Sequence, residues 1–580
     1  MKTAEIVKIL EEIADLLDLK GENVFKSRAY QKAARSLEFY TGDIEQLTRE
    51  GRLREIPGIG EAIAAKITEL VTSGHLQYYD KLRAEFPPGI STLLDIPGIG
   101  PRTAFLLAQQ LKITTVDELE KAVASGQVAA LPRMGEKTAQ NILQQIKLYR
   151  KKKNEQRVPL GSALPVAESL VESLKLVPHL ENATLAGSLR RFRDTIGDID
   201  ILAISRAPAG VLEAFSHLPQ VREVREKGPA KVTVIAGAGL QVDFRLFDPA
   251  AFGSALQYAT GSKQHNIDLR TRAEHLGLSL SEYGITVRAT GVTETFADEE
   301  SFYQRQDLQF IPPEIREGTH EIELAAVNRL PALLELSDIR GDLHVHTDWS
   351  DGLASLPQMV QAARQHGYEY ICITDHSQGL GIARGLDKDR VLEQIRIIRE
   401  LNRSLPGIQV LTGMEVNIRA DGSLDADDEV LSQLDIVLAS VHSGFNQSAD
   451  KITRRVITAL QNPHVDILAH PTGRLLGERA AVELDFTAVC QTAAEYRTAL
   501  EINALPSRLD LKDTHIYQAR EMGVPLVIGT DAHRTQQLDF MRYGVKTARR
   551  GWCQAGDVLN TLSWTDLKQR LKNSSSAATD

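Results

Sequence analysis

The chain is poor in cysteine, and its apolar residues form no long run. Cys372, Cys490 and Cys553 are the three cysteines among 580 residues, and no two of them form a CxxC pair. This spacing argues against a disulfide scaffold and against a thiolate zinc site, so we expect a reducing compartment. No stretch approaches the roughly 18 uninterrupted apolar residues of a membrane span, and the N-terminus is amphipathic and acidic rather than basic and then apolar. We therefore expect a cytoplasmic protein with no membrane partner.

Net positive charge is lacking as well. The formal charge is −10, which at first argues against a nucleic-acid partner, because binding a polyanion requires cationic side chains. The charge is uneven, however: +3 over residues 1–160, −7 over residues 161–340 and −6 over residues 341–580. Nine of the 15 histidines follow residue 340. The sequence thus has a nearly neutral first part and an acidic, histidine-rich last part.

What the chain contains is enough apolar sequence for several globular domains. Hydrophobic residues make up 42% of the chain and charged residues 25%, which is typical of folded proteins. A single core usually stops growing at about 250 to 300 residues, so 580 residues predict a multidomain protein.

A short motif occurs three times before residue 136. Residues 55–60 and 95–100 share the pattern acid-Ile-Pro-Gly-Ile-Gly, and residues 130–135 are a weaker copy. Each copy precedes a helical pattern, which predicts a helix-hairpin-helix whose glycines allow the reversal and expose amides to a phosphate. An ordinary helix–helix turn is the alternative for one copy, but the repetition favours DNA binding. The expected DNA contacts in the hairpins are Gly58, Gly60, Gly98 and Gly100.

Three carboxylates are expected on neighbouring strands in the second part of the chain. Residues 197–202 predict a strand in which Asp198 and Asp200 share one face, and residues 240–247 predict a further strand that carries Asp243. Such a cluster repels itself unless cations bind, and two Mg²⁺ ions are the standard arrangement for nucleotidyl transfer. Asp-x-Asp alone is also common on solvent-facing strands. The turn at residues 187–188 and Arg190 or Arg191 could bind a triphosphate, which favours the catalytic interpretation.

Histidine and carboxylate residues recur after apolar strands in the last part of the chain. In repeated βα architecture the carboxyl ends of the strands meet at one face. A single histidine after a strand is more often structural, but seven strand ends that offer His, Asp or Glu predict a polynuclear metal site suited to Zn²⁺, Mn²⁺ or Fe. The residues concerned are His344, His346, Asp351, His376, Glu415, His442, His470, Asp531 and His533.

Residues 1–320 resemble the family X DNA polymerases, the beta-like repair enzymes. The resemblance rests on residues 187–191 (Gly-Ser-Leu-Arg-Arg), 197–200, 242–245 and 258–266 (Tyr-Ala-Thr-Gly-Ser-Lys-Gln-His-Asn). It implies that Asp198, Asp200 and Asp243 hold two Mg²⁺ or Mn²⁺ ions and that Asp243 accepts the primer 3′-hydroxyl proton. The implied nucleotide contacts are Gly187, Ser188, Arg191, Tyr258, Gly261, Asn266 and Arg270. Ala259 and Lys263 depart from the family pattern, which leaves sugar selectivity and fidelity open.

The same resemblance suggests a 5′-deoxyribose-phosphate lyase in the first domain. Lys66 stands at the place of the Schiff-base nucleophile, and Lys26 and Tyr30 match positions that contact DNA phosphate. Such a lysine needs a lowered pKa from burial or a nearby cation. Ala62 replaces a second expected lysine, and an ordinary helix lysine stays the alternative.

Residues 341 to about 570 resemble the polymerase-and-histidinol-phosphatase (PHP) superfamily, whose fold is a distorted (βα)7 barrel with a trinuclear metal site. The resemblance implies that up to three Mn²⁺ or Zn²⁺ ions activate a water for phosphodiester hydrolysis and that Arg508 grips the substrate phosphate. His344, His346, Glu415 and Asp531 would hold one ion, Glu415, His442 and His470 a second, and Asp351, His376 and His533 the third.

These patterns predict a fixed order of domains. All-α helix-hairpin-helix domains, lyase-like over residues 1–80 and fingers-like over 81–150, precede an α/β nucleotidyltransferase palm (151–250) and a thumb (251–320). A linker (321–340), the PHP barrel (341–572) and a flexible tail (573–580) are expected to follow.

The predicted function is DNA-directed gap filling in repair, with 3′-5′ exonuclease activity in the PHP domain. The expected partners are gapped or primed DNA and dNTPs, and a monomer is expected. One alternative is a PHP phosphatase or phosphoesterase attached to a degenerate polymerase that only binds DNA. A second is a non-catalytic scaffold at DNA ends. The complete acid triad and the complete ligand set argue against both.

Overall fold

The computed structural model divides into two compact units, residues 1–156 and 157–580. It describes residues 3–20, 44–56, 59–84, 101–131, 157–237, 239–379 and 383–572, and scattered positions between residues 26 and 37, 93 and 99, and 134 and 146. Gly58, Gly98 and Gly100, the start of the basic stretch at 151–156 and the predicted tail at 573–580 lie outside the described residues.

Within the described part of the first unit, the regular secondary structure is helical. Ile6, Ile9, Leu10, Ile13 and Leu17 recur at the spacing that predicts an amphipathic helix; Ile9 is partly buried and the other four are fully buried in the core. A capping box between Thr115 and Glu118 marks the start of one later helix. The helices are α1 (Thr3–Lys20), α3 (Ile44–Glu50), the 3₁₀ turn η1 (Leu53–Glu55), α4 (Glu61–Ser73), α5 (Gln77–Ala84), α6 (Pro101–Leu111) and α7 (Val116–Ala124).

The three repeats close with the same backbone hydrogen bond. The amides of Ile59, Ile99 and Met134 donate to the carbonyls of the residues three positions earlier, at 3.1, 3.0 and 3.0 Å. Both apolar residues of each copy are buried, so each repeat anchors its turn in the core. α4 begins directly after Gly60 and α6 directly after residue 100, which is the predicted hairpin-to-helix order.

The second unit begins with a five-stranded palm sheet in the order β2-β4-β7-β6-β5. β4 and β7 run parallel, and every other pair in this sheet is antiparallel. The predicted strands at 197–202 and 240–247 are both present, and β6 pairs with the second of them. The elements are β1 (Val158–Pro159), α9 (Leu160–Leu174), β2 (Leu180–Leu185), α10 (Gly187–Arg190), β3 (Thr195–Ile196), β4 (Asp198–Ser205), α11 (Pro208–Ser216), β5 (Val221–Lys227), β6 (Lys231–Ala236) and β7 (Leu240–Phe247).

A helical thumb with a small three-stranded sheet, β10-β9-β8, follows the palm. Its elements are η3 (Pro249–Ala251), α12 (Phe252–Thr260), α13 (Lys263–His275), β8 (Leu278–Ser281), β9 (Gly284–Val287), β10 (Thr293–Glu294), α14 (Glu299–Gln304), η4 (Pro313–Ile315) and α15 (Glu321–Ala326). The stretch predicted as a linker at 321–340 contains α15 and η5 (Leu336–Asp338), and Leu334 in it is fully buried.

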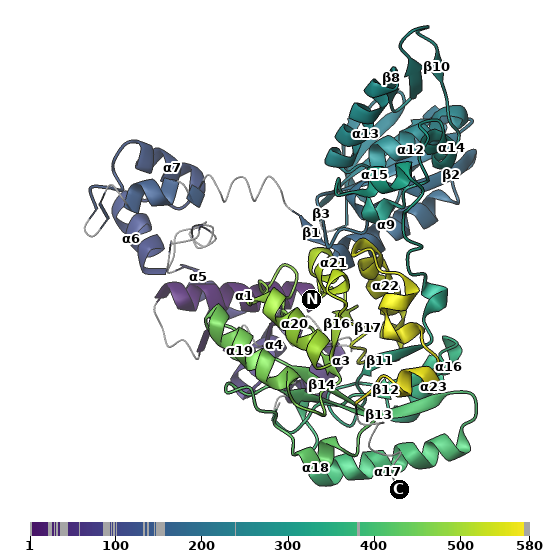
Figure 1. Cartoon of the computed structure of the whole chain (residues 1–580). Helices are drawn as coiled ribbons and strands as arrows, with labels where there is room; N and C mark the ends of the chain where they lie inside the picture. The colour runs from purple at the N-terminus through teal and green to yellow at the C-terminus, as the bar shows by residue number, and fades with distance from the viewer. Residues whose placement is uncertain are drawn as a thin grey trace. The chain divides into compact units, whose positions relative to one another are not determined.

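Seven parallel strands in sequential order, β11 to β17, form the C-terminal barrel. The amide of Asp531 donates to His344 O and that of His346 to Ala532 O, both at 2.9 Å, so the end of the sheet returns to its beginning. Helices α17, α19, α20 and α22 surround the strands (Figure 1). The strands are β11 (Gly341–Val345), β12 (Tyr370–Ile373), β13 (Gln409–Asn417), β14 (Ile436–Ser440), β15 (Ile467–Leu468), β16 (Ala499–Asn503) and β17 (Leu526–Gly529). The helices are α16 (Leu356–Gln365), α17 (Lys388–Ser404), α18 (Asp428–Leu431), α19 (Ala449–Leu460), α20 (Phe486–Glu495), α21 (Asp513–Glu521), η7 (Thr535–Phe540), α22 (Met541–Arg550), η8 (Ala555–Asp557), η9 (Leu559–Thr561) and α23 (Trp564–Lys568).

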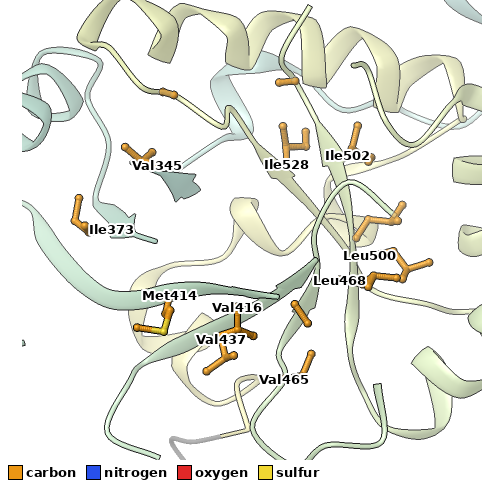
Figure 2. Close-up of a cluster of buried hydrophobic side chains, with 14 of the residues drawn as sticks. Val345, Ile373, Met414, Val416, Val437, Val465, Leu468, Leu500, Ile502 and Ile528 are labelled. Atoms are coloured by element: carbon orange, nitrogen blue, oxygen red, sulfur yellow. The ribbon is translucent and has the colours of Figure 1, made fainter. Parts of the chain in front are cut away.

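Alternation along the barrel strands separates an apolar layer from the polar site. Met414 and Val416 on β13 belong to the large apolar cluster shown in Figure 2, together with residues of the other strands. Glu415 lies between them in sequence, so its side chain points to the opposite face of the strand. Leu500 and Ile502 flank Glu501 on β16 in the same way.

The palm and the barrel share apolar contacts within the second unit. Leu509 and Tyr543 of the barrel belong to the palm's hydrophobic cluster, and the rings of Phe192 and Tyr543 lie 5.6 Å apart. Arg474 of the barrel donates to Asp194 Oδ2 at 3.0 Å and to the carbonyl of Arg508 at 3.0 Å. The segment after Ser188 in the palm is thus bonded to the loop that carries Arg508.

Candidate active sites

The pairing of β4 with β7 brings the three palm acids together. Asp200 lies opposite Asp243 in the parallel register, and Asp198 shares the face of Asp200 two residues earlier. Asp243 is buried, and its Oδ1 accepts a hydrogen bond from Thr233 Oγ1 at 2.6 Å. Its Oδ2 lies 3.5 Å from both Lys231 Nζ and Arg245 Nη2.

The electrostatics of this cluster favour a bound cation. Burial, reinforced by the negative charge of Asp198, raises the pKa of Asp200 to about 7. The cluster therefore resists full ionisation on its own. Divalent cations ligated by carboxylate oxygens would offset this repulsion, so the donor set fits Mg²⁺ or Mn²⁺.

Next to the acids, the turn at Gly187 brings the backbone close to Asp200. Gly187 has φ +61°, and a Cβ there would lie 2.3 Å from Asp200 Oδ2. A glycine meets both demands, the positive φ and the close approach. The adjacent Ser188 Oγ is buried and makes no hydrogen bond within the described residues, so this hydroxyl is available to a ligand.

The structure assigns different surroundings to the two arginines of this motif. Arg190 donates to Thr260 Oγ1 at 2.7 Å and to Glu299 Oε2 at 2.5 Å. Arg191 donates from Nε to Glu317 Oε1 at 3.2 Å and from Nη1 to the carbonyl of Thr260. Arg190 thus joins palm to thumb through a carboxylate that is also bonded to buried Arg316, which favours Arg191 as the ligand contact.

The predicted thumb contacts lie beside Arg191. A Cβ on Gly261 would lie 3.3 Å from Arg191 Nη1. Asn266 donates to Tyr258 O at 2.8 Å, and Arg270 Nε donates to the carbonyl of Asn266 at 3.0 Å. The Tyr258 side chain is 38% exposed. The thumb residues therefore form one connected group at the start of α13.

In the barrel, all nine predicted ligand residues converge at one end of the strands. Glu415 is central: its Oε1 lies 2.9 Å from His470 Nε2 and 3.2 Å from His442 Nε2, and its Oε2 lies 3.0 Å from His376 Nδ1. His533 Nε2 lies 3.3 Å from Asp351 Oδ1, and His346 Nε2 lies 3.4 Å from Asp531 Oδ1. Three groups have donor atoms spaced to hold an ion: His346, Asp351, His376 and His533; His344, His346 and Asp531; and His376, Glu415 and His442.

The nitrogen positions fit metal coordination. The Nε2 atoms of His344 and His346 lie 3.1 Å apart, close to the roughly 3.3 Å that separates two nitrogens each about 2.0 Å from one tetrahedral ion. The Nδ1 atoms of His346 and His470 are buried and make no hydrogen bond within the described residues. The converging imidazole nitrogens and the carboxylates between them fit Zn²⁺ or Mn²⁺.

The barrel site mixes raised and lowered histidine pKa values. Burial alone would lower the pKa of His376, but Glu415 and Asp351 outweigh it and raise this pKa to about 10. Burial and the neighbouring rings of His533 and His376 lower the pKa of His346 to about 4. A metal must displace the protons of the raised histidines, so its affinity will fall as the pH falls.

Glu501 is a site residue that the sequence did not identify. Its Oε1 lies 2.6 Å from His344 Nδ1, and its Oε2 accepts from the amide of His470 at 2.6 Å. A Cβ on Gly529 would lie 2.2 Å from Glu501 Oε1, so the following strand leaves room for this carboxylate. The sequence did contain a sign of this role, because Glu501 lies in the middle of an otherwise apolar strand. A carboxylate buried there is costly unless another group pairs with it.

Arg508 lies at the edge of the barrel site. Its Nε is 3.4 Å from Asp531 Oδ2 but makes no hydrogen bond within the described residues. The side chain is mostly buried. Its charge is thus placed beside the candidate metal ligands, where a substrate phosphate could bind.

The predicted lyase residues form a group of cations and aromatic rings. Lys66 Nζ lies 4.9 Å from the ring centre of Tyr78 and 6.0 Å from that of Tyr30, and Lys26 Nζ lies 5.7 Å from Tyr78. Lys66 also donates to Ala62 O at 3.2 Å. The two lysines thus approach the same tyrosine ring, that of Tyr78.

Comparisons with known proteins agree with this geometry. Residues 1–76 match a helix-hairpin-helix domain, residues 90–148 a SAM-like helix-hairpin-helix tandem, residues 255–317 the DNA polymerase beta thumb and residues 342–504 the PHP domain. The DNA polymerase/3′-5′ exonuclease PolX of Bacillus subtilis (strain 168) is 41% identical over 574 residues, which cover 99% of this chain and 100% of that protein. The chain belongs to the PolX family. This confirms the predicted resemblance to family X polymerases with a PHP domain.

Two shorter relatives of this PolX-family chain have a different name. A probable phosphatase of Thermoanaerobacter sp. (strain X514) is 30% identical over 38% of this chain and 89% of its own length. A probable phosphatase of Shewanella sp. (strain MR-4) is 32% identical over 33% of this chain and 75% of its own length. Among the described residues, no helix combines the length and the apolarity that a membrane crossing requires.

Proposed function

We propose that the chain fills short gaps in DNA by template-directed synthesis at the palm and removes 3′-terminal nucleotides at the PHP barrel. The observation that supports this most is the in-register pairing of Asp200 with Asp243 beside a glycine turn and the Ser188 hydroxyl, which has no hydrogen-bond partner among the described residues. The full-length similarity to a DNA polymerase/3′-5′ exonuclease supports both activities.

At the palm, the chain's own residues would bind and orient the nucleotide. Asp198, Asp200 and Asp243 hold two Mg²⁺ or Mn²⁺ ions, which when bound offset the charge of the attacking and leaving oxygens. Ser188 and Arg191 bind the triphosphate, and Tyr258, Gly261, Asn266 and Arg270 line the nucleotide and the template minor groove. Asp243 accepts the proton of the primer 3′-hydroxyl as its oxygen bonds to the α-phosphorus and pyrophosphate leaves.

At the barrel, the nine histidine and carboxylate residues would hold up to three Mn²⁺ or Zn²⁺ ions. Such ions supply a hydroxide at neutral pH when bound. Glu415 shares its two oxygens between neighbouring positions, Glu501 orients His344, and Arg508 binds the phosphate next to the terminal nucleotide. Hydrolysis would then release a nucleoside monophosphate and leave a 3′-hydroxyl for synthesis.

The hairpins and the lyase group would act on the DNA around the gap. Gly58, Gly60, Gly98 and Gly100 are proposed to bind phosphates through main-chain amides, and Lys26 and Tyr30 are proposed as further phosphate contacts. A 5′-deoxyribose-phosphate lyase at Lys66 is an additional candidate activity, supported by the approach of Lys26 and Lys66 to the same ring, that of Tyr78. We propose a monomer that acts in the cytoplasm on gapped or primed DNA with dNTPs.

A one-nucleotide gapped duplex with a 5′-phosphate and a labelled primer tests the proposal. With dNTPs we expect extension by one nucleotide, and without dNTPs we expect primer shortening that requires added Mn²⁺. Metal content should be measured on the same preparation. The chain's similarity to probable phosphatases favours one alternative, a PHP phosphatase attached to a degenerate polymerase. Release of phosphate from small phosphomonoesters, with neither extension nor shortening of the primer, would support that alternative.

A further inference from the structure

The last residue of helix α22, on the barrel, reaches into the palm. Arg550 Nη1 donates to the carbonyl of Arg191 at 2.7 Å and to Glu317 Oε1 at 3.0 Å, and its Nη2 donates to Asp513. The Arg550 side chain is 3% exposed. One buried guanidinium of the barrel therefore bonds to the backbone of a predicted nucleotide contact and to the carboxylate that this contact uses.

Arg191 and Arg550 share a single carboxylate oxygen. Arg191 Nε lies 3.2 Å from Glu317 Oε1, the same atom that Arg550 contacts. Arg193 completes the group, 3.6 Å from Glu317 and 3.8 Å from Asp513. Three guanidinium groups thus face two carboxylates, which leaves one positive charge in excess.

The shared oxygen matters because Glu317 competes with a triphosphate for Arg191. A carboxylate with a single arginine partner forms a strong charge-assisted pair with it. A second arginine on the same oxygen weakens the hold of Glu317 on Arg191, while the bond to the Arg191 carbonyl keeps the backbone of that residue in place. Loss of Arg550 would remove both effects.

We propose that Arg550, a residue of the PHP barrel, is a positioning residue for nucleotide binding at the palm: it anchors the Arg191 backbone and shares Glu317 so that the Arg191 guanidinium can bind the triphosphate. This inference rests on the proposed polymerase function and on Arg191 as its triphosphate contact. It makes the barrel part of the nucleotide site through a single side chain.

The test is the KM for dNTP on a one-nucleotide gap, measured for wild type, Arg550→Met and Arg542→Met in the full chain. Arg542 lies on the same helix and forms its own ion pair with Glu168 of the palm, at 2.7 Å, so it is a matched control. We expect Arg550→Met to raise KM about tenfold, equal to about 1.4 kcal/mol, with kcat changed by less than about threefold. Arg542→Met should leave KM unchanged.

A double variant separates positioning from simple loss of structure. Adding Glu317→Gln to Arg550→Met removes the competitor and should restore part of the lost dNTP affinity, which general destabilisation would not do. Primer shortening without dNTPs checks that the barrel is folded. If Arg550→Met fails that check, Arg550→Lys carries the test: it keeps the charge but lacks the planar fork for several acceptors, and should raise KM by a smaller factor.

Several outcomes would overturn the inference. Equal KM values for Arg550→Met and wild type, or equal increases in the Arg550→Met and Arg542→Met variants, would show that Arg550 does not position Arg191. An unchanged KM in Arg191→Met would remove the contact on which the inference depends. Absence of incorporation by the wild-type protein would instead overturn the proposed polymerase function itself.

Discussion

At Gly187, one hydrogen in place of a methyl group determines where a candidate metal ligand can lie. A Cβ there would meet Asp200 Oδ2 at 2.3 Å, and the positive φ of +61° strains any other residue. We expect Gly187→Ala to displace the Asp200 carboxylate and to lower the rate of nucleotide incorporation about 100-fold. Primer-extension kinetics would measure the loss.

The control for this change is Gly210→Ala. Gly210 lies in helix α11, where a Cβ meets nothing within 4 Å, so extension should stay at the wild-type rate. Exonuclease activity should be retained in both variants, because the barrel site is built from other strands. Wild-type extension by Gly187→Ala would contradict the role of this close approach.

Glu501 is the residue-scale test of the barrel site. Its bond to His344 Nδ1 at 2.6 Å orients the ring and makes the opposite nitrogen a better ligand. We expect Glu501→Gln to weaken Mn²⁺ or Zn²⁺ binding about 10- to 100-fold, because a neutral amide is a poorer acceptor than a carboxylate. Metal titration of the apoprotein, with metal content by elemental analysis, is the measurement.

An exposed glutamate serves as the comparison. Glu495 is the last residue of helix α20 and is exposed. Glu495→Gln should therefore leave the affinity for Mn²⁺ or Zn²⁺ unchanged. Equal affinities in wild type and Glu501→Gln would show that His344 does not depend on this carboxylate.

At the scale of elements, η4 of the thumb is tied to α22 of the barrel by one buried carboxylate. Glu314 Oε1 lies 2.6 Å from Lys546 Nζ and 3.0 Å from Arg549 Nε. Burial alone would raise the pKa of Glu314, but the charges of Lys546 and Arg549 lower it to about 2. Because the unfolded chain takes up this proton near pH 4.3, Glu314 stabilises the fold fully above about pH 5 and progressively less as the pH falls towards 2.

We therefore expect Glu314→Gln to lower the free energy of unfolding at pH 7 by about 3 kcal/mol, since the change removes the buried carboxylate that the buried Arg549 shares with the partly exposed Lys546. The difference from wild type should narrow as the pH falls from 5 to 3. Urea unfolding across this pH range measures it. Glu300 is exposed on α14, so Glu300→Gln should unfold with the wild-type free energy at every pH. If the loss of stability in Glu314→Gln were the same at pH 5 and pH 3, the lowered pKa of Glu314 would be contradicted.

Periodicity explains why the elements themselves were predictable. Asp198 and Asp200 share a face because strands have a period of two, and Ile6, Leu10, Ile13 and Leu17 share one because helices have a period near 3.6. Both patterns were present in the sequence and both are confirmed. The register that pairs Asp200 with Asp243 was not visible, because strand pairing depends on residues more than 40 positions apart.

At the scale of the whole molecule, two candidate sites share one chain without sharing a residue. We expect Asp200→Ala to abolish nucleotide incorporation and to spare primer shortening, and His344→Ala to do the reverse. The physical reason is that the acids of the palm sheet and the ligands of the barrel lie on separate sheets. Both reactions should be followed on the same labelled gapped duplex.

Circular dichroism would confirm that both variants fold. Loss of both activities in either folded variant would show that the two reactions depend on each other. If Asp200→Ala still incorporated nucleotides, synthesis would not depend on the palm acids.

The formal charge of −10 does not describe the surface that DNA would meet. Part of the acidic excess after residue 160 consists of Asp198, Asp200, Asp243, Asp351, Glu415 and Asp531, which converge in the two candidate metal sites. Bound cations would offset these charges, so the sum overstates the repulsion that DNA would meet.

Short motifs were sufficient to predict the family and to name residues that the fold brings together, because metal and phosphate chemistry require particular side chains at close spacing along the chain. The roles of Glu501, Arg550 and Glu317 were not predictable in this way. Each contacts a partner that is distant in sequence, 157 positions away for Glu501 and His344. Folding alone brings such partners into contact, since packing and charge pairing act through space and leave no periodic pattern in the sequence.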